Sequence, residues 1–193
     1  NEYYRGGKSF NPTDADISPD GVLYVVDGYS PGKYVLTADL ESMAYKPFYF
    51  GGPVPDGGRT PGRFSTNHGV TYDPEDGTLL VADRERQWVQ RLTLGGEFVE
   101  GYDTAGGNPC DADLVEWGGD QILVVGCRVG EAGAAPGGVQ LLRDGEVVST
   151  LRPKTDLGLE AFQHIHNAVV VVVDGELYWL CYGFNPGCYA VLQ

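Results

Sequence analysis

One hairpin pattern recurs along the chain and constrains the fold more than any other feature. In its clearest copy, residues 65–86, His68 opens an alternating strand, an Asp-Gly turn follows, and a second apolar strand ends in Ala-Asp-Arg-Glu. Antiparallel pairing brings His68 and Arg84 to the same end of this hairpin. Further copies carry other polar residues at the equivalent places. The repeat predicts a scaffold, and the varying residues at one rim predict the site.

The residue content favours an all-β protein. The chain has 29 glycines and 12 prolines, and little of its apolar patterning has the helical period of 3.6 residues. Its 193 residues can bury a substantial core, and no linker interrupts the repeat. We therefore expect a single domain over residues 1–193.

The hairpins group into four units that predict a four-bladed β-propeller. The blades cover about residues 11–52, 67–103, 108–153 and 164–193. The last blade lacks one strand, and the β-like segment within residues 1–10 supplies it if the N-terminal strand closes the ring. Ring closure also removes exposed sheet edges. If the chain is a fragment, the native ring is larger.

The charge of the chain limits its partners. A formal net charge of −14 repels nucleic acid and anionic membranes. The longest apolar run, residues 168–173, is far shorter than the ~20 residues that cross a bilayer. We expect a monomer that binds a small molecule or a peptide C-terminus, with no nucleic-acid or membrane partner.

Alignment of the four units places one residue at the start of each innermost strand: Thr13, His68, Cys110 and His166. The second strands end at residues 27–29, 83–84, 127–128 and 181–182. We predict that these positions surround the mouth of one central channel. Histidine nitrogen is a preferred zinc ligand, so His68 and His166 are candidate metal ligands. His164 lies two residues before His166, points the same way along a strand, and is a candidate third ligand.

Alternatives to this ligand set stay open. The histidines could simply form hydrogen bonds in a polar channel, and Cys110 could act as a soft ligand beside His68 and His166. Asp14 and Asp111 could supply oxygen ligands, although acidic residues at such places are more often turn or capping groups.

Three further residues are candidate catalytic groups. Tyr29 follows Asp27-Gly28 at a hairpin end, where its phenol could act as a base. Arg84 and Arg128 occupy equivalent rim positions, and a guanidinium binds a carboxylate through two hydrogen bonds. These residues suit a substrate that ends in a carboxylate.

The four cysteines predict two disulfides. Cys110 and Cys127 should meet across one hairpin, and Cys181 and Cys188 across the next. Paired cysteines indicate a secreted or periplasmic protein. The absence of an initiator methionine is consistent with a processed or trimmed chain.

Two segments resemble NHL-repeat propellers, and specifically the peptidyl-α-hydroxyglycine α-amidating lyases. They are Pro12-Thr-Asp-Ala-Asp with Leu23-Tyr-Val-Val-Asp-Gly-Tyr29, and Pro61-Gly-Arg-Phe-Ser-Thr-Asn-His68 with Leu80-Val-Ala-Asp-Arg-Glu-Arg86. The resemblance covers about residues 9–100, with a looser echo at residues 165–175. It implies a zinc or other divalent transition metal on channel histidines and a structural calcium.

The resemblance also implies an activity, the cleavage of a peptidyl-α-hydroxyglycine into a peptide amide and glyoxylate. It implies Tyr29 as the catalytic tyrosine, His68 and His166 as metal ligands, and Arg84 as an active-site arginine. The alternatives are a non-enzymatic NHL propeller that binds a peptide or protein, and a metal-dependent hydrolase or lyase for another small acid.

Overall fold

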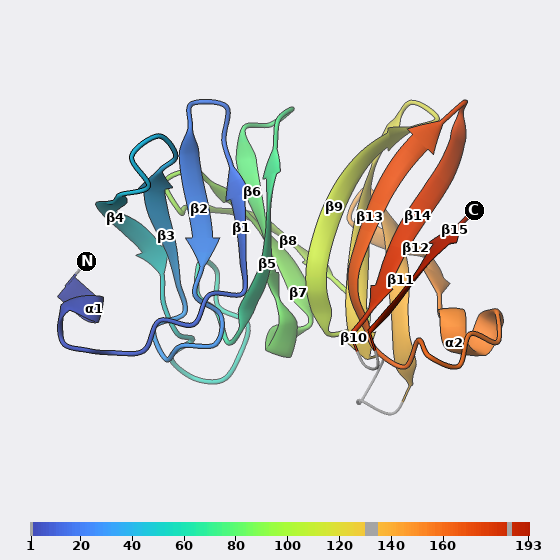
Figure 1. Cartoon of the computed structure of the whole chain (residues 1–193), viewed down its shortest axis with the longest axis horizontal. Coiled ribbons are helices and arrows are strands. Elements are labelled where there is room, and N and C mark those ends of the chain that lie inside the picture. Colours follow the sequence, from blue (N-terminus) through green and yellow to red (C-terminus); the bar gives the residue numbers. More distant parts are fainter. Residues whose placement is uncertain (1, 130–134, 185–186) are drawn as a thin grey trace. The chain divides into compact units, whose positions relative to one another are not determined.

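The computed structural model describes residues 2–129, 135–184 and 187–193 (Figure 1). The chain forms two compact units. Unit 1 is Asn1–Arg86 with Gln90–Glu100, and unit 2 is Gln87–Val89 with Gly101–Gln193. Residues 130–134 and 185–186 lie outside the described residues. These two units do not test whether residues 1–193 form a single domain, which stays a prediction.

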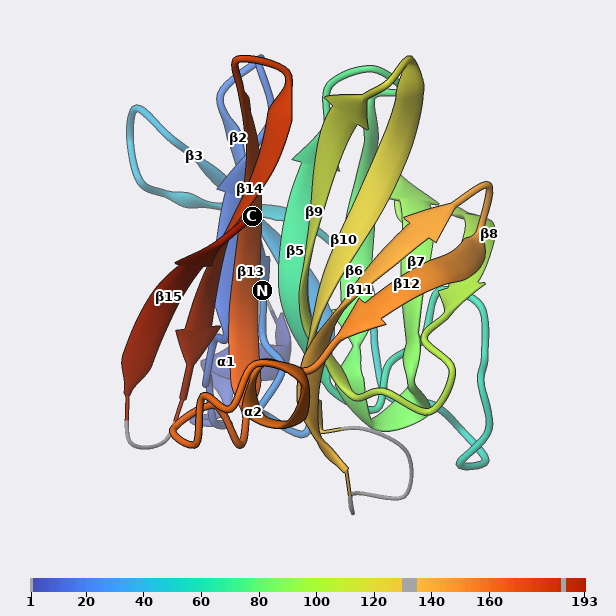
Figure 2. The same cartoon turned by 90° about the vertical axis from the view of Figure 1, so that its right-hand side faces the viewer.

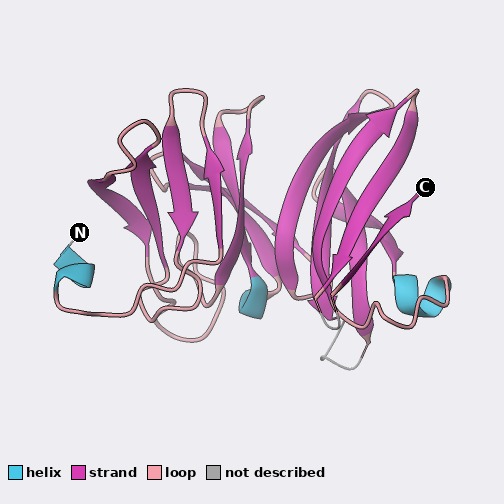
Figure 3. Ribbon diagram, viewed as in Figure 1, coloured by secondary structure: helices cyan, strands magenta, loops and turns pink. Residues whose placement is uncertain are grey.

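Antiparallel strands make up most of the described chain (Figure 3). The first sheet has the order β1-β2-β3-β4, with strands Asp14–Ile17, Val22–Val26, Tyr34–Asp39 and Tyr45–Gly51. The second has the order β5-β6-β7-β8, with strands Asn67–Asp73, Thr78–Asp83, Trp88–Thr93 and Phe98–Asp103. A short 3-10 helix, η1 (Arg84–Arg86), follows β6.

Unit 2 holds the other two sheets, which Figure 2 shows from the side of β13 and β14. The third sheet has the order β12-β11-β10-β9, with β9 Pro109–Trp117, β10 Asp120–Val129, β11 Pro136–Arg143 and β12 Glu146–Leu151. The fourth has the order β13-β14-β15, with strands Ile165–Val173, Glu176–Gly183 and Cys188–Leu192. The helices α1 (Glu2–Arg5) and α2 (Pro153–Asp156) are single turns, and no helix in the described part of the chain is long and apolar enough to cross a membrane.

The all-β prediction and its four sheets are confirmed, but the predicted N-terminal closing strand is wrong. Residues 2–5 form α1, and the fourth sheet has three strands among the described residues. The physical reason lies in the first sheet. Asp27 is fully buried, and its carboxylate accepts hydrogen bonds from the Tyr4 hydroxyl and the Asn11 backbone N–H. A buried carboxylate needs such donors, so the N-terminal segment is held beside β2 in unit 1.

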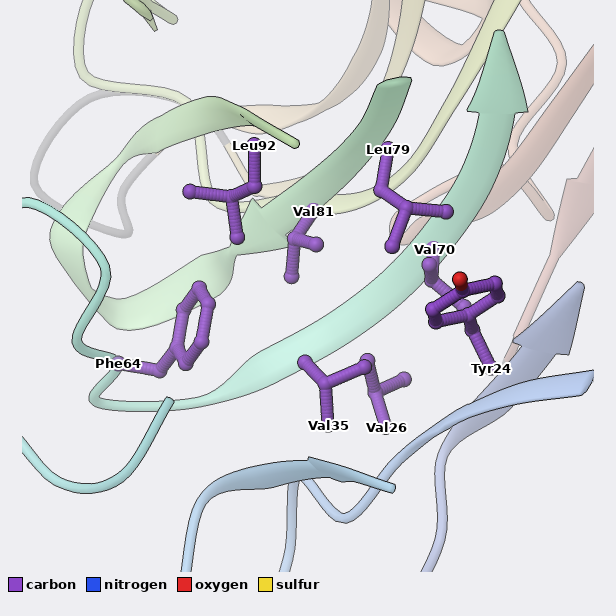
Figure 4. Close-up of a cluster of buried hydrophobic side chains, with 8 residues drawn as sticks. All are labelled: Tyr24, Val26, Val35, Phe64, Val70, Leu79, Val81 and Leu92. Carbon is purple, nitrogen blue, oxygen red and sulfur yellow. The ribbon is translucent and has the colours of Figure 1, made fainter. Parts of the chain in front are cut away.

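Each unit has its core between its sheets. In unit 1, side chains from the first two sheets meet around Val26, Val35, Phe64, Leu79 and Val81, all of them without exposed surface (Figure 4). In unit 2, apolar side chains of β10 and β11 pack against those of β13 and β14 in the same manner. Alternation along each strand sends these side chains to one face of a sheet, where their burial drives folding.

Aspartates on the inner strand of one sheet bind the inner strand of the next. In unit 1, Asp14 accepts the Val70 N–H at 2.9 Å and Asp16 accepts the Tyr72 N–H at 2.6 Å, which joins β1 to β5. In unit 2, Asp113 accepts the Val170 N–H at 3.0 Å, which joins β9 to β13. Hydrogen bonds to a charged acceptor are stronger than those between neutral groups, so these carboxylates fix one sheet against another.

A buried arginine holds the second sheet together. The Arg91 guanidinium lies 2.5 Å from the Asp73 carboxylate and donates to Thr78 at 2.8 Å, and the side chains of Arg91 and Asp73 are 6% and 0% exposed. It also contacts the carboxylates of Asp76 at 3.0 Å and Glu100 at 3.2 Å. These contacts join the β5–β6 turn to β7 and β8.

Replacement of this arginine tests the role of the cluster. Arg91→Met leaves the buried Asp73 carboxylate without its cation and should lower the free energy of unfolding by about 3–5 kcal/mol. Arg143→Met is the matched control, because the Arg143–Asp120 pair is 42% and 51% exposed and should contribute less than about 1 kcal/mol. Urea unfolding followed by circular dichroism measures both. Equal losses in the two variants would contradict the assignment.

Candidate functional site in unit 1

The turn after β2 sets the position of Tyr29. Asp27 anchors this turn, because its carboxylate also accepts a hydrogen bond from the Ser30 hydroxyl. A Cβ on Gly28 would collide with the Asn67 carbonyl oxygen and the Thr13 hydroxyl, so only glycine fits where the turn meets β5. The Tyr29 backbone N–H donates to the Asn11 carbonyl at 3.2 Å. In the Asp-Gly-Tyr sequence, Asp27 therefore anchors the turn, Gly28 allows the turn to pack closely on β5, and Tyr29 presents its phenol.

Tyr29, His68 and Arg84 form one hydrogen-bonded cluster. The Tyr29 hydroxyl lies 3.0 Å from His68 Nε2, and Arg84 Nη1 donates to the same hydroxyl at 2.8 Å. The Tyr29 and His68 rings meet edge to face at 5.5 Å, and the Arg84 guanidinium lies 5.3 Å from the Tyr29 ring centre. Tyr29 is 49% exposed and His68 is 3% exposed. A solvent-accessible phenol therefore rests on a buried imidazole and a guanidinium.

Two further charged residues belong to this cluster, and the sequence reasoning missed Lys33. Arg84 Nε donates to Glu85 at 2.9 Å. Lys33 Nζ donates to the Gly28 carbonyl at 2.6 Å and so braces the turn that carries Tyr29. Burial lowers the pKa of Lys33, and the Arg84 charge lowers it further against the opposing effect of nearby carboxylates. The sequence signal that could have identified Lys33 is the Pro-Gly-Lys turn, which begins two residues after Tyr29.

His68 owes its orientation to a β-bulge. On β5, Asn67 pairs with Asp83 and Gly69 pairs with Ala82, so His68 is the extra residue of the bulge. Asp83 is fully buried, and its carboxylate accepts the Ser65 and Thr66 N–H groups at 2.9 Å. A bulge re-aims one side chain without ending the strand. The bulge turns His68 toward Tyr29, close to the end of β6, where η1 begins with Arg84.

Unit 2 repeats this bulge at the other predicted ligands. The register shifts between Gly126 and Cys127, opposite Cys110, and between Ile165 and Asn167, around His166. The sequence alignment of His68, Cys110 and His166 therefore identified equivalent positions, although the sequence did not indicate the bulges. The Sγ of Cys110 and a ring nitrogen of His166 lie within 4.8 Å of each other.

His166 is oriented by a chain of polar side chains. Asn167 Nδ2 donates to the Asp111 carboxylate at 2.9 Å, so Asn167 Oδ1 faces His166 Nδ1 at 2.7 Å. This contact places a proton on Nδ1 and the lone pair on Nε2. A carboxylate or amide behind a histidine is the usual outer arrangement of a metal ligand. The ring also stacks on Phe184 at 5.4 Å.

Other predicted residues have different surroundings. The bulge interrupts the strand alternation that was expected to point His164 and His166 the same way, and His164 Nδ1 lies 3.4 Å from the Arg128 carbonyl. Arg128 Nε is buried and has no hydrogen-bond partner among the residues that the structure describes. Asp14 and Asp111 bind protein donors, as described above. The catalytic role of Arg128 and the metal role of His164 stay predictions.

The predicted disulfides are absent, because Cys110, Cys127, Cys181 and Cys188 are free thiols in the structure. In the fourth sheet, Cys188 pairs with Gly183 and Cys181 pairs with Ala190, so those two cysteines are not opposite each other. Burial raises the pKa of Cys127 and raises the pKa of Cys181 to about 11. The prediction of a secreted or periplasmic protein rested on these bridges and stays a prediction.

Comparison with known proteins shows the fold. No family model matches the chain, and no curated protein matches it. The β-propeller domain of Cps50 (Swd1) from Myceliophteria thermophila is similar over 91% of this chain and 50% of that one, at 13% identity and a TM-score of 0.54. The predicted propeller fold class is thereby confirmed.

Two solved proteins of unknown function are also similar. One, from Bacteroides caccae, has a TM-score of 0.58 at 16% identity, over 90% of this chain and 57% of that one. The other, from Desulfotomaculum acetoxidans, has a TM-score of 0.53 at 15% identity, over 94% and 55%. The chain spans about half the length of each of these three structures.

Alkylation tests the state of the thiols. We expect iodoacetamide to add to four cysteines in denaturant without reductant, because the structure has no disulfide. In the folded protein at pH 8, Cys127 and Cys181 should react slowest, because their raised pKa values leave little thiolate. Mass spectrometry of the peptides locates each adduct. A protein that takes up alkylating agent only after reduction would contradict the structure.

Proposed function

We propose that the protein is a carbon–nitrogen lyase that splits a peptidyl-α-hydroxyglycine into a peptide amide and glyoxylate. The observation that carries this proposal is the hydrogen-bonded cluster of Tyr29, His68 and Arg84. It combines a proton acceptor that solvent can reach with a cation for a carboxylate. The resemblance of residues 9–100 to amidating lyases assigns the same tyrosine and the same arginine to the reaction.

The reaction needs one proton removed and one added. Tyr29, as the phenolate, takes the proton of the substrate α-hydroxyl. The freed electron pair forms the carbonyl of glyoxylate while the carbon–nitrogen bond breaks toward nitrogen. The leaving amide nitrogen then takes this proton from the Tyr29 hydroxyl, which regenerates the phenolate and returns the site to its starting state. Arg84 stabilises the phenolate, because its Nη1 already donates to the Tyr29 oxygen.

Arg84 also has a role in binding. Its Nε donates to Glu85 in the structure, so a substrate carboxylate competes with Glu85 for the guanidinium. The Glu85 side chain is 41% exposed and can swing into solvent at little cost. The Arg84–Glu85 pair therefore keeps the guanidinium aligned until substrate arrives.

His68 has two possible uses at this site. Its Nε2 contacts the Tyr29 hydroxyl at 3.0 Å, so it can exchange a proton with the phenol. If it also binds a metal, it does so through Nδ1 or after that contact is broken. Either use makes Tyr29 depend on His68, because the buried ring fixes the hydroxyl position.

A metal is the second part of the proposal. The residues of unit 2 fit one, because Asn167 and Asp111 leave the lone pair of His166 on Nε2 and Cys110 lies close by. A bound zinc would act as a Lewis acid toward the substrate hydroxyl. The sharing of one ion by His68 and His166, with His164 or Cys110 as a third ligand, stays a prediction, as does a structural calcium.

Release of glyoxylate tests the activity. The purified protein should release glyoxylate from α-hydroxyhippurate, and Tyr29→Phe should slow release by about 100-fold or more, because the base is lost. Tyr189→Phe is the matched control, since Tyr189 is 78% exposed and should leave the rate unchanged. Colorimetric measurement of glyoxylate reads both variants.

Each other outcome points to a different function. A rate in Tyr29→Phe equal to that of the unaltered protein would remove the phenol from the mechanism. A metal-loaded protein that releases no glyoxylate would favour a hydrolase or lyase for another small acid.

Elemental analysis tests the metal. We expect about one transition metal per chain after purification in zinc, and Asn167→Ala should weaken its binding by about 10- to 100-fold, because the imidazole loses its orienting partner. His164→Ala and Cys110→Ala decide which of the two is the third ligand. A protein that takes up no metal would support the alternative of a non-enzymatic propeller that binds a peptide or protein.

A further inference from the structure

A small apolar cavity lies in unit 1 between the N-terminal segment and the first sheet. Its volume is about 220 Å³, and Tyr4, Phe10, Leu36, Tyr45 and Lys46 line it. Tyr4 and Phe10 come from α1 and the segment after it, Leu36 from β3, and Tyr45 and Lys46 from β4, which are labelled in Figure 1. None of these residues belongs to the Tyr29 cluster.

Three aromatic rings in contact with one another form much of the cavity wall. Tyr4 and Phe10 meet edge to face at 5.7 Å, and Phe10 and Tyr45 meet edge to face at 5.9 Å. Phe10 and Tyr45 are nevertheless 43% and 53% exposed. Covering these rings with a flat apolar group lowers the free energy of the complex. The rings already pack on one another, so their side chains lose little conformational entropy on binding.

The wall formed by the N-terminal segment is tied to the rest of unit 1. The buried Asp27 carboxylate accepts the Tyr4 hydroxyl and the Asn11 N–H at 2.7 Å. Asn11 in turn accepts the Tyr29 N–H. The segment is therefore held over the sheet by the same aspartate that anchors the Tyr29 turn, and the cavity is part of the fold.

Charge at the rim decides which ligand suits the cavity. A box of aromatic rings often binds an organic cation. Here Lys46 is the one charged side chain among the described residues that line the cavity, and none of the ion pairs within 4 Å among the described residues includes it. Its charge acts at longer range on the exposed Asp39 carboxylate, whose pKa is lowered mainly by hydrogen bonds from Ser42 and less by Lys46. Its ammonium group repels a cation and attracts an anion at the mouth of an apolar box.

The cavity volume limits the size of the apolar group. An engineered apolar cavity of about 150 Å³ binds benzene. A cavity of about 220 Å³ accepts a somewhat larger planar group, such as an indole. We propose that this cavity binds a small aromatic carboxylate, with its ring against Phe10, Tyr45 and Leu36 and its carboxylate on Lys46. This proposal does not depend on the lyase activity.

Calorimetric titration with 3-indolepropionate tests the site, with its neutral amide and 3-(indol-3-yl)propyl-trimethylammonium as comparison ligands. We expect saturable one-to-one binding of the acid and about tenfold weaker binding of the amide, because the amide lacks the charge that pairs with Lys46. Lys46→Met should weaken binding of the acid by about tenfold and leave binding of the amide unchanged. Arg143→Met, which removes an equal charge from an exposed pair, should alter neither.

A second variant separates the cavity from general charge attraction. Phe10→Ala removes one exposed wall and should weaken the acid and the amide alike, with circular dichroism confirming that the variant is folded. Absence of saturable binding of the acid at millimolar concentration would overturn the proposal. So would tighter binding of the ammonium ligand, or equal binding of the acid by the Lys46→Met variant.

Discussion

Carboxylates that bind the backbone of a neighbouring sheet hold each unit in register. A lone antiparallel sheet could slide over its neighbour, because apolar contacts have little directionality. Asp14 and Asp16 remove that freedom in unit 1 by accepting two N–H groups of β5, and Asp113 does so in unit 2 with β13. The sequence spells the same Asp-Ala-Asp at both places. These links bring the start of one inner strand next to the turn of the preceding sheet, which is where the functional candidates lie.

This register determines what the bulges can do. His68 and His166 each lie at a bulge at the start of an inner strand, just before the residues that the aspartates bind. In unit 1 the bulge turns the imidazole onto Tyr29, and η1 follows β6 with Arg84 beside them. In unit 2 the equivalent imidazole meets Asn167 and Phe184. The same backbone bulge thus places the two imidazoles in different surroundings, which depend on the neighbouring residues.

The sequence predicts much of this fold for identifiable reasons. Strand alternation and Asp-Gly turns are local signals, so the hairpins and the equivalence of His68, Cys110 and His166 could be read from the chain. The approach of Arg84 to His68 followed from antiparallel pairing alone. The N-terminal segment was misjudged because its position depends on the buried Asp27, a distant partner that short-range pattern does not show. The Cys181–Cys188 disulfide prediction failed because Cys188 pairs with Gly183, two positions along β14 from Cys181, where a simple hairpin reading would have placed the two cysteines opposite each other.

The central claim is that Tyr29, His68 and Arg84 act as one functional unit, and a double-mutant cycle on glyoxylate release tests it most directly. Residues that act together on one proton lose most of their effect once either is removed. At saturating substrate, where the separate contribution of Arg84 to carboxylate binding no longer limits the rate, we expect the variant carrying both Tyr29→Phe and Arg84→Met to release glyoxylate no more slowly than the slower single variant. Losses that multiply in the double variant, or an unaltered protein that releases no glyoxylate from α-hydroxyhippurate, would contradict it.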